Sequence, residues 1–218
     1  MCFSAPASFG VATGIGLAGA AAIGRTSETR EIPLASVPLI FATQQVIEGA
    51  LWLALGSENP SRWVLPLANA FMFSALVVWP LCASLAASLV EPNRIRRLGM
   101  LFVFVLAIPL AFRGVRGMWT QPYGACVVYS SISYGNGLPY SPLQFADYVL
   151  CSCGPFLLSS HKTLRIFGAI VAAGLIVAAL LYTYAYVSVW CFFAAAGSLT
   201  IYLHFARAQN ERASQLSR

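Results

Sequence analysis

Three side chains that could hold a ligand share one face of a long apolar segment near the N-terminus. Gln44, Glu48 and Trp52 are spaced i, i+4 and i+8, so in a helix an amide, a carboxyl and an indole lie along one face, with Gln45 beside them. An acidic residue at the centre of a membrane helix costs about 2.5–3.5 kcal/mol on insertion. We therefore expect this face to point into a helix bundle, with Glu48 protonated or strongly hydrogen-bonded.

Two interpretations of this polar face stay open. In the structural one it is a clamp, in which Gln44 and Glu48 bond to the backbone of neighbouring helices. In the functional one it belongs to a binding site, because ionisable residues inside membranes mark ligand sites and transport routes.

Other polar side chains fall at a similar depth in their own apolar segments. At 1.5 Å per residue, Glu48 lies about 12 Å and Asp147 about 8 Å below the outer ends of their segments. Tyr184 and Cys191 also lie in this layer. A small-molecule site is usually an apolar pocket with a few placed polar groups. We therefore predict a ligand pocket in the outer half of the molecule, built from Gln44, Gln45, Glu48, Trp52, Asn69, Asp147, Tyr182, Ser188 and Trp190.

The elements that must position these residues are membrane helices. Of the 218 residues, 59% are hydrophobic and only 9% charged, whereas a soluble domain carries about 25% charged residues. Apolar segments able to cross a hydrocarbon core of about 30 Å recur along the chain. We predict spans at 8–24, 34–56, 63–90, 98–113, 142–160, 166–184 and 187–206. The expected fold class is all-α, a polytopic bundle of seven transmembrane helices in a single domain, 1–206, followed by a basic tail, 207–218.

The distribution of basic residues predicts the orientation. With seven spans and the N-terminus outside, ten Lys and Arg fall inside and three, Arg62, Arg113 and Arg116, fall outside. Without the span at 98–113 the division would be seven to six, so the positive-inside rule favours seven crossings with a cytoplasmic C-terminus. The inner basic residues would face anionic lipid headgroups. Basic residues placed singly between apolar segments do not indicate nucleic-acid binding.

The longest connection, 114–141, joins the fourth and fifth spans on the outside and is rich in Tyr, Gly and Ser. Long loops in compact proteins are usually functional or disordered. We expect this one to form an ordered cover over the outer mouth of the bundle.

The first span is almost entirely Gly and Ala and contains a G-x-x-x-G pattern at Gly10 and Gly14. Small residues let helix backbones approach closely. We therefore predict that this helix is packed inside the bundle.

Cysteines and histidines suggest a second function, that of a metal- or haem-dependent membrane enzyme or redox protein. Cys2 and Cys126 are both predicted outside, where oxidising conditions allow a disulfide. After removal of Met1, the amine and thiolate of Cys2 could instead chelate a soft metal. His161 and His204 fall at inner helix ends, where they could bind a metal or haem together or simply anchor the helices at the interface. The residues point to no particular cofactor. A third possibility is an accessory subunit that binds a protein partner within a membrane complex.

Two known classes of seven-helix protein do not fit. The only lysine, Lys162, lies at the inner interface, whereas a retinal Schiff base needs a lysine deep in the bundle. Zinc hydrolases of the ceramidase type need three histidines and this chain has two.

Four motifs carry a resemblance that runs from end to end: MCFSAPASF, QQVIEGALW, LLSSHKTLRIFG and SVWCFFAA. On these motifs the chain resembles an uncharacterised bacterial family of multi-pass membrane proteins whose members begin Met-Cys-Phe-Ser-Ala. The resemblance implies a protein of the bacterial inner membrane with no assigned activity and supplies no catalytic residues. It places Cys2, Gln45, Glu48, His161 and Trp190 within family-like motifs.

Overall fold

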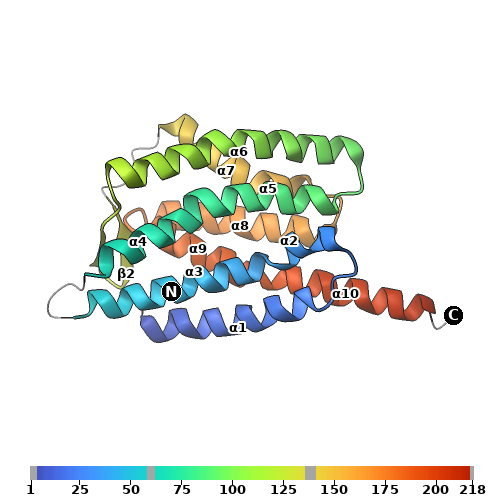
Figure 1. Ribbon diagram of the computed structural model, residues 1–218, viewed down its shortest axis with the longest axis horizontal. Helices are drawn as coiled ribbons and strands as arrows, with labels where there is room; N and C mark the ends of the chain where they lie inside the picture. Colours follow the sequence, from blue (N-terminus) through green and yellow to red (C-terminus); the bar gives the residue numbers. More distant parts are fainter. Residues whose placement is uncertain (1–3, 58–61, 136–140, 217–218) are drawn as a thin grey trace.

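Long helices lie side by side in a bundle, and their ends gather at two opposite ends of the molecule (Figure 1). The computed structural model describes residues 4–57, 62–135 and 141–216. Its helices are α1 Ala5–Ile23, α2 Ile32–Ala35, α3 Val37–Leu55, α4 Val64–Phe73, α5 Trp79–Val90, α6 Arg94–Thr120, α7 Pro142–Leu158, α8 Lys162–Leu181, α9 Tyr186–Gly197 and α10 Leu199–Leu216. A 3-10 turn, Thr29–Glu31, precedes α2, and a π-helical segment, Ser74–Val78, joins α4 to α5.

Six helical segments of the described chain are long and apolar enough to cross a membrane, as expected for a multi-pass membrane protein. They are Ala5–Ile23, Thr29–Leu55, Val64–Val90, Arg94–Thr120, Lys162–Leu181 and Tyr186–Gln215. The remaining apolar helix, α7, has 17 residues and is shorter than these. The fold is therefore helical and membrane-compatible, and the helices carry the polar residues to fixed depths.

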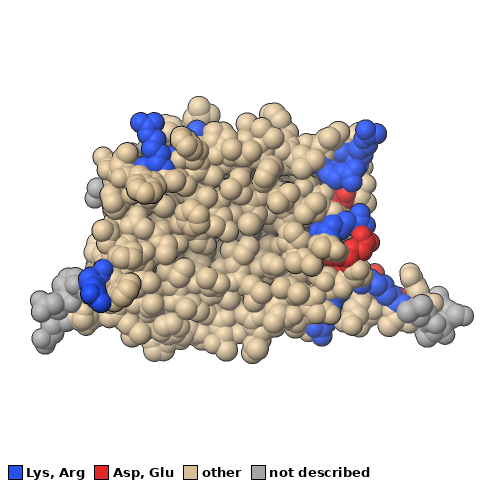
Figure 2. Space-filling model, viewed as in Figure 1, with Lys and Arg blue, Asp and Glu red and all other residues tan. Residues whose placement is uncertain are grey.

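Charge separates the two ends of the bundle. Figure 2 shows an uncharged belt between the ends, with most of the visible Lys and Arg at one of them. We call this the basic end, because the turns before α6 and α8 place Arg94, Arg96, Arg97 and Lys162 there. The opposite end, which carries the strands β1 and β2, is called the hairpin end (Figure 1).

The connection at the hairpin end differs from the predicted loop. Helix α6 continues to Thr120, so the non-helical connection begins at Gln121 and not at residue 114. It forms a two-stranded antiparallel hairpin, β1 Ala125–Val128 and β2 Ser131–Tyr134. In β2, Ile132 and Tyr134 are buried against the bundle, because alternate residues of a strand point to the same face.

Helix α8 ends at Leu181, earlier than the predicted span. Tyr182 and Tyr184 therefore lie in the turn between α8 and α9 and not within a helix. This turn is at the hairpin end, opposite β2.

The prediction that the first helix is enclosed by the bundle was wrong. Helix α1 lies at the edge of the molecule and packs mainly on α3 (Figure 1). A Cβ at Gly10 or Gly14 would have no atom within 4 Å, so the G-x-x-x-G face is open. The close approach is made elsewhere, by Gly19 against Leu39 and by Gly49 of α3 against Phe9.

Candidate functional site

Glu48 is the centre of a buried polar cluster where α3 meets α9 and β2. Its side chain is fully buried. The Ser188 hydroxyl donates to Glu48 Oε1 at 2.5 Å, and the Tyr134 hydroxyl donates to the same oxygen at 3.4 Å. Gln45 Nε2 donates to Glu48 Oε2 at 3.2 Å. Ser, Tyr and Gln can each supply a donor to a carboxyl group, so the cluster holds this acidic side chain in one orientation.

Helices α3 and α9 meet along their polar faces in antiparallel directions. One turn from the Glu48–Ser188 contact, Gln44 Nε2 donates to Cys191 Sγ at 3.2 Å. The spacing of four residues on α3 thus matches a spacing of three on α9. The predicted polar face of α3 does point into the bundle, and its partners are mainly side chains and not the backbone.

Several buried polar atoms near this face have no hydrogen-bond partner among the residues that the structure describes. They are Gln44 Oε1, Gln45 Oε1, Trp52 Nε1 and Trp79 Nε1. An unsatisfied buried group costs about 1–3 kcal/mol. The cluster is therefore not a fully satisfied structural clamp.

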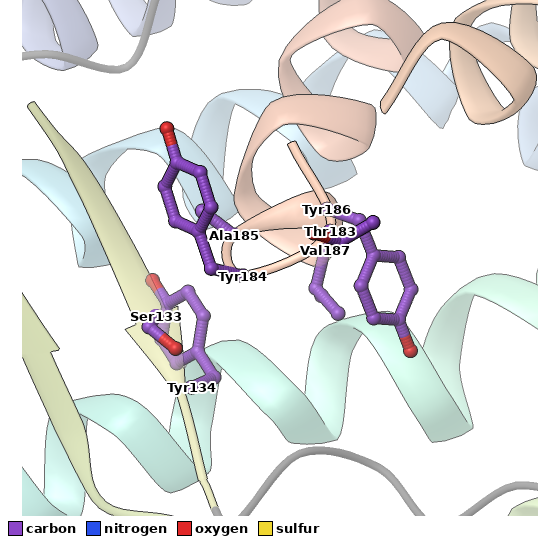
Figure 3. Close-up of a pocket in the computed structure, with 7 residues that line it drawn as sticks. All are labelled: Ser133, Tyr134, Thr183, Tyr184, Ala185, Tyr186 and Val187. Carbon is purple, nitrogen blue, oxygen red and sulfur yellow. The ribbon is translucent and has the colours of Figure 1, made fainter. Parts of the chain in front are cut away.

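A pocket lies next to the cluster at the hairpin end, between β2 and the α8–α9 turn (Figure 3). Its volume is about 130 Å³. Its lining residues are Ser133, Tyr134, Thr183, Tyr184, Ala185, Tyr186 and Val187. Tyr134 belongs to both sites, because it lines the pocket and also contacts Glu48. Among the described residues, the lining contains hydroxyl and aromatic groups and no charged side chain.

Two of the predicted pocket residues have other partners. Asn69 exchanges two hydrogen bonds of 3.1 Å with the backbone of Tyr123 and so fixes the segment after α6. Asp147 pairs with Arg113 at 3.2 Å on a partly exposed surface. Asn69 and Asp147 therefore bind Tyr123 and Arg113, and their place in a ligand site stays a prediction.

The other predicted pocket residues are Trp52, Trp190 and Tyr182. Trp190 donates from Nε1 to the Val171 carbonyl at 2.9 Å and packs edge-on against Tyr148. Trp52 is half-buried. The Tyr182 ring is half-buried, with its centroid 6.4 Å from that of Tyr184, which lines the pocket.

Comparison with known proteins gives the chain a family. Residues 1–216 match the model of a family of unknown function, DUF6629. The chain belongs to this family. The expected resemblance to an uncharacterised family is confirmed at that level. No curated protein and no solved structure matches the chain. The DUF6629 family description assigns no activity. The arrangement of the side chains around Glu48 is therefore the basis for a functional proposal.

The histidines of this DUF6629 protein do meet at the basic end. The rings of His161 and His204 have centroids 5.1 Å apart. His161 Nε2 lies 3.1 Å from the Val90 carbonyl, and His204 Nδ1 lies 2.9 Å from the Thr163 hydroxyl. Within the described part of the chain, no group of three or more His, Cys, Asp or Glu could hold a metal ion. A metal or haem role for this pair stays a prediction.

Of the two cysteines predicted outside, the structure describes Cys126. Cys126 is exposed on β1. Cys2 lies outside the described residues, so the predicted disulfide and the predicted metal site at Cys2 both remain predictions.

Sequence reasoning missed a second buried carboxylate in the DUF6629 chain, Glu91, in the turn between α5 and α6. It is 2% exposed and accepts hydrogen bonds from Ser160 N at 2.8 Å, Ser160 Oγ at 2.5 Å and Ser159 Oγ at 3.2 Å. The backbone N–H of Asn93 also donates to it, at 3.1 Å. These contacts explain the two serines of the LLSSH motif. The available signal was a lone acidic residue that directly follows an apolar segment.

Hydrogen bonding decides the ionisation of Glu91. Burial alone would raise the pKa of this carboxyl. The hydrogen bonds from Ser160, Asn93 and Ser159 outweigh burial and hold the pKa below its ordinary value. Glu91 is therefore a charged latch between the α5–α6 and α7–α8 turns at the basic end.

Sequence reasoning also missed Tyr134, which the hairpin carries to Glu48. It was treated as part of a covering loop. The alternation of serine with Ile132 and Tyr134 in Ser131–Tyr134 was the available signal, but four residues are too few to distinguish a strand from a loop.

Proposed function

We propose that this protein is a small-ligand-binding protein of the bacterial inner membrane, acting as a sensor or a transporter. Its ligand site is the pocket at the hairpin end, which faces the outside. In this topology the chain crosses the membrane seven times, with the N-terminus outside and the C-terminus in the cytoplasm.

The seventh crossing would be α7. This helix begins on the side of the hairpin and ends beside the basic end, where α8 starts. At 1.5 Å per residue, its 17 residues extend about 26 Å. That length is close to the roughly 30 Å of a hydrocarbon core.

The charge asymmetry supports the proposed orientation. Within the described residues, nine Lys and Arg belong to the basic end and its tail: Arg25, Arg30, Arg94, Arg96, Arg97, Lys162, Arg165, Arg207 and Arg212. Three belong to the hairpin end: Arg62, Arg113 and Arg116. Cytoplasmic segments carry the excess of basic residues, and there they face anionic lipids.

The observation that carries the ligand proposal is the position of Tyr134. Its side chain connects the pocket to Glu48, so a molecule bound in the pocket can change the hydrogen bonds of a buried acid. The unsatisfied amide oxygens of Gln44 and Gln45 also argue against a purely structural clamp.

The chemistry of the pocket indicates the class of ligand. Its volume of about 130 Å³ is below the range of 300–1,000 Å³ that is usual for drug-sized ligands. Its hydroxyl groups and tyrosine rings suit a small neutral molecule with an apolar body and a hydrogen-bonding group. Gln44 and Trp190, which were expected to touch the ligand, border a void without room for a water molecule. Contact is therefore assigned to Tyr134 and the other lining residues.

The first prediction tests this pocket with a panel of small phenols, alcohols and amides. We expect at least one of them to raise the melting temperature of the purified protein. Thr183→Trp, which fills the pocket with a large ring, should abolish this shift. Thr120→Trp, an exposed threonine at the same end but outside the pocket, should leave it unchanged.

Variants at Glu48 separate ligand binding from a structural role. If Glu48→Gln folds and loses the ligand-induced shift, the site is functional. If Glu48→Gln and Glu48→Ala both fail to fold, and Thr183→Trp binds the panel as well as the wild type does, the cluster is only a clamp.

A further inference from the structure

We infer that Glu48 is a reversible proton-binding site that exchanges protons with the hairpin end through Tyr134 and is closed toward the basic end. This inference does not depend on any ligand occupying the pocket. It assigns an activity, one-sided proton exchange, to a carboxyl group that is fully buried among helices.

A short hydrogen bond joins Glu48 to Ser188. The 2.5 Å between Ser188 Oγ and Glu48 Oε1 is in the range of O–H···O bonds in which one partner is ionised. The Ser188 hydroxyl is therefore placed to share a proton with the Glu48 carboxyl group.

Both protonation states can be accommodated without rebuilding the cluster. The carboxylate accepts hydrogen bonds from Ser188, Tyr134 and Gln45. When a proton is on Oε1, the Ser188 hydroxyl oxygen can accept a hydrogen bond from it. The Ser188 hydroxyl hydrogen can then turn toward a backbone carbonyl one helical turn back. A site that keeps its hydrogen bonds in both states can bind and release a proton reversibly.

Tyr134 supplies the route to the outside. Its hydroxyl group contacts Glu48 Oε1, and the same residue lines the pocket (Figure 3). On release, the Glu48 Oε1–H turns from Ser188 toward the Tyr134 hydroxyl oxygen and its proton passes to that oxygen, while the original Tyr134 hydroxyl proton passes to a water in the pocket. The net step converts a carboxylic acid and water into a carboxylate and hydronium, and it needs no other reactant.

Aromatic packing closes the opposite direction. About two helical turns from Glu48 toward the basic end, the Phe41 ring packs on Trp79 with centroids 4.6 Å apart. Trp79 in turn contacts Phe156 and Phe167, at 5.8 and 6.1 Å. The void bordered by Phe41, Gln44 and Trp79 has no room for a water molecule. These rings therefore separate Glu48 from the basic end.

Ionisable neighbours of Glu48 come from β2 and α9. Among the described residues, Tyr134 of β2 donates a hydrogen bond to Glu48, and Cys191 of α9 lies close enough to interact with it electrostatically. Phenols and thiols ordinarily ionise above neutral pH. Helices α1, α2 and α4 carry no ionisable side chain, and those of α10 begin at Tyr202, toward the basic end.

Infrared spectroscopy of the protein in lipid vesicles tests the inference without any ligand. Protease access to the tail selects preparations in which the hairpin end faces outward. We expect an external pH jump to change the carbonyl band of a protonated carboxyl group, and an internal jump to leave it unchanged. Glu48→Gln should remove this band. Tyr134→Phe should slow the response about 100-fold, the scale of a positioned proton-transfer group.

Tyr148→Phe is the matched control. It also removes the hydroxyl of a buried tyrosine, and that hydroxyl donates to the Ala75 carbonyl at 2.9 Å. It should leave the rate unchanged.

Three results would overturn the inference. The first is a carbonyl band that responds to the internal pH, and the second is a Tyr134→Phe protein whose band responds as fast as that of the wild type. The third is a loss of the band when sodium is added at constant pH. If Glu48→Gln does not fold, the rates of Tyr134→Phe and Tyr148→Phe still decide the matter. A pocket that binds no panel compound would refute the ligand proposal and leave this test intact.

Discussion

Among the described residues, two carboxyl groups are buried in different ways. Glu48 lies among helices and accepts hydrogen bonds from the hydroxyls of Ser188 and Tyr134 and from the amide of Gln45. Glu91 lies in a turn at the basic end and receives two of its four hydrogen bonds from backbone N–H groups. Backbone donors are fixed by the fold, so Glu91 is held as a structural anion. The donors of Glu48 are side chains that can rotate, and this suits a group whose protonation changes.

The latch at Glu91 makes a testable contribution to stability. Glu91→Gln replaces an acceptor oxygen by an amide nitrogen that faces donors, so we expect it to lower the free energy of unfolding at neutral pH by ~1–3 kcal/mol. Because the pKa of folded Glu91 lies below the ordinary glutamate value of about 4.3, the wild-type contribution is present above that pH. It is lost as the pH falls through the folded pKa.

Thermal unfolding in detergent at a series of pH values measures this effect. The difference between Glu91→Gln and wild type should shrink as the pH falls below about 4. Glu28→Gln is the control, because Glu28 lies at the same end and pairs with Arg30 on an exposed surface. Such pairs contribute about 0–1 kcal/mol. An equal loss in both variants at all pH values would contradict the latch.

At the scale of elements, the packing of α1 on α3 depends on glycines that are not part of the G-x-x-x-G pattern. A Cβ at Gly19 would lie 2.8 Å from Leu39 Cγ and 3.0 Å from the Leu39 backbone nitrogen. Contacts this short force the helices apart, so we expect Gly19→Ala to destabilise the protein by ~1–3 kcal/mol.

Gly14→Ala is the matched control for this prediction. Gly14 is in the same helix and a Cβ there meets no atom within 4 Å. Alanine favours a helix over glycine by ~0.5–1 kcal/mol, so this variant should be neutral or slightly stabilising. Melting temperatures of the two variants in one detergent make the comparison. The reverse order would mean that α1 packs through its G-x-x-x-G face.

The sequence predicted how far along each helix a polar residue lies, but not which way its side chain points. Apolar length fixes where helices lie and how deep each polar residue falls, so the α3 face with Gln44 and Glu48 was placed correctly. Depth does not fix rotation about the helix axis. Asn69 and Asp147 were therefore expected near Glu48 but bind Tyr123 and Arg113 instead.

Tyr134 could not be placed for a different reason. A hairpin with strands of four residues has no strong periodicity, and its position over α9 is set by long-range packing. The same holds for Glu91, whose partners Ser159 and Ser160 are nearly 70 residues away in sequence. Polar partners brought together by tertiary packing leave little trace in a single sequence.

At the scale of the whole molecule, the proposed ligand site and most of the charged residues lie at opposite ends of the bundle axis. The pocket and the Glu48 cluster lie toward the hairpin end, whereas the charged latch and most basic residues lie at the basic end (Figure 2). If the basic end is cytoplasmic, the pocket samples the outside of the cell. The proposed sensor or transporter role therefore depends on the orientation.

Thiol labelling of intact cells tests both the orientation and the number of spans. In a Cys2→Ser background, a membrane-impermeant maleimide should label Cys126, which is exposed on β1, without permeabilisation. Ser214→Cys in a Cys2→Ser, Cys126→Ser background should react only after the membrane is opened, because residue 214 lies on the tail of α10. Three crossings separate these positions if α7 spans the membrane, and two if it does not. Labelling of both sites in intact cells would therefore reduce the topology to six spans. Labelling of the tail alone would invert the orientation and turn the pocket toward the cytoplasm.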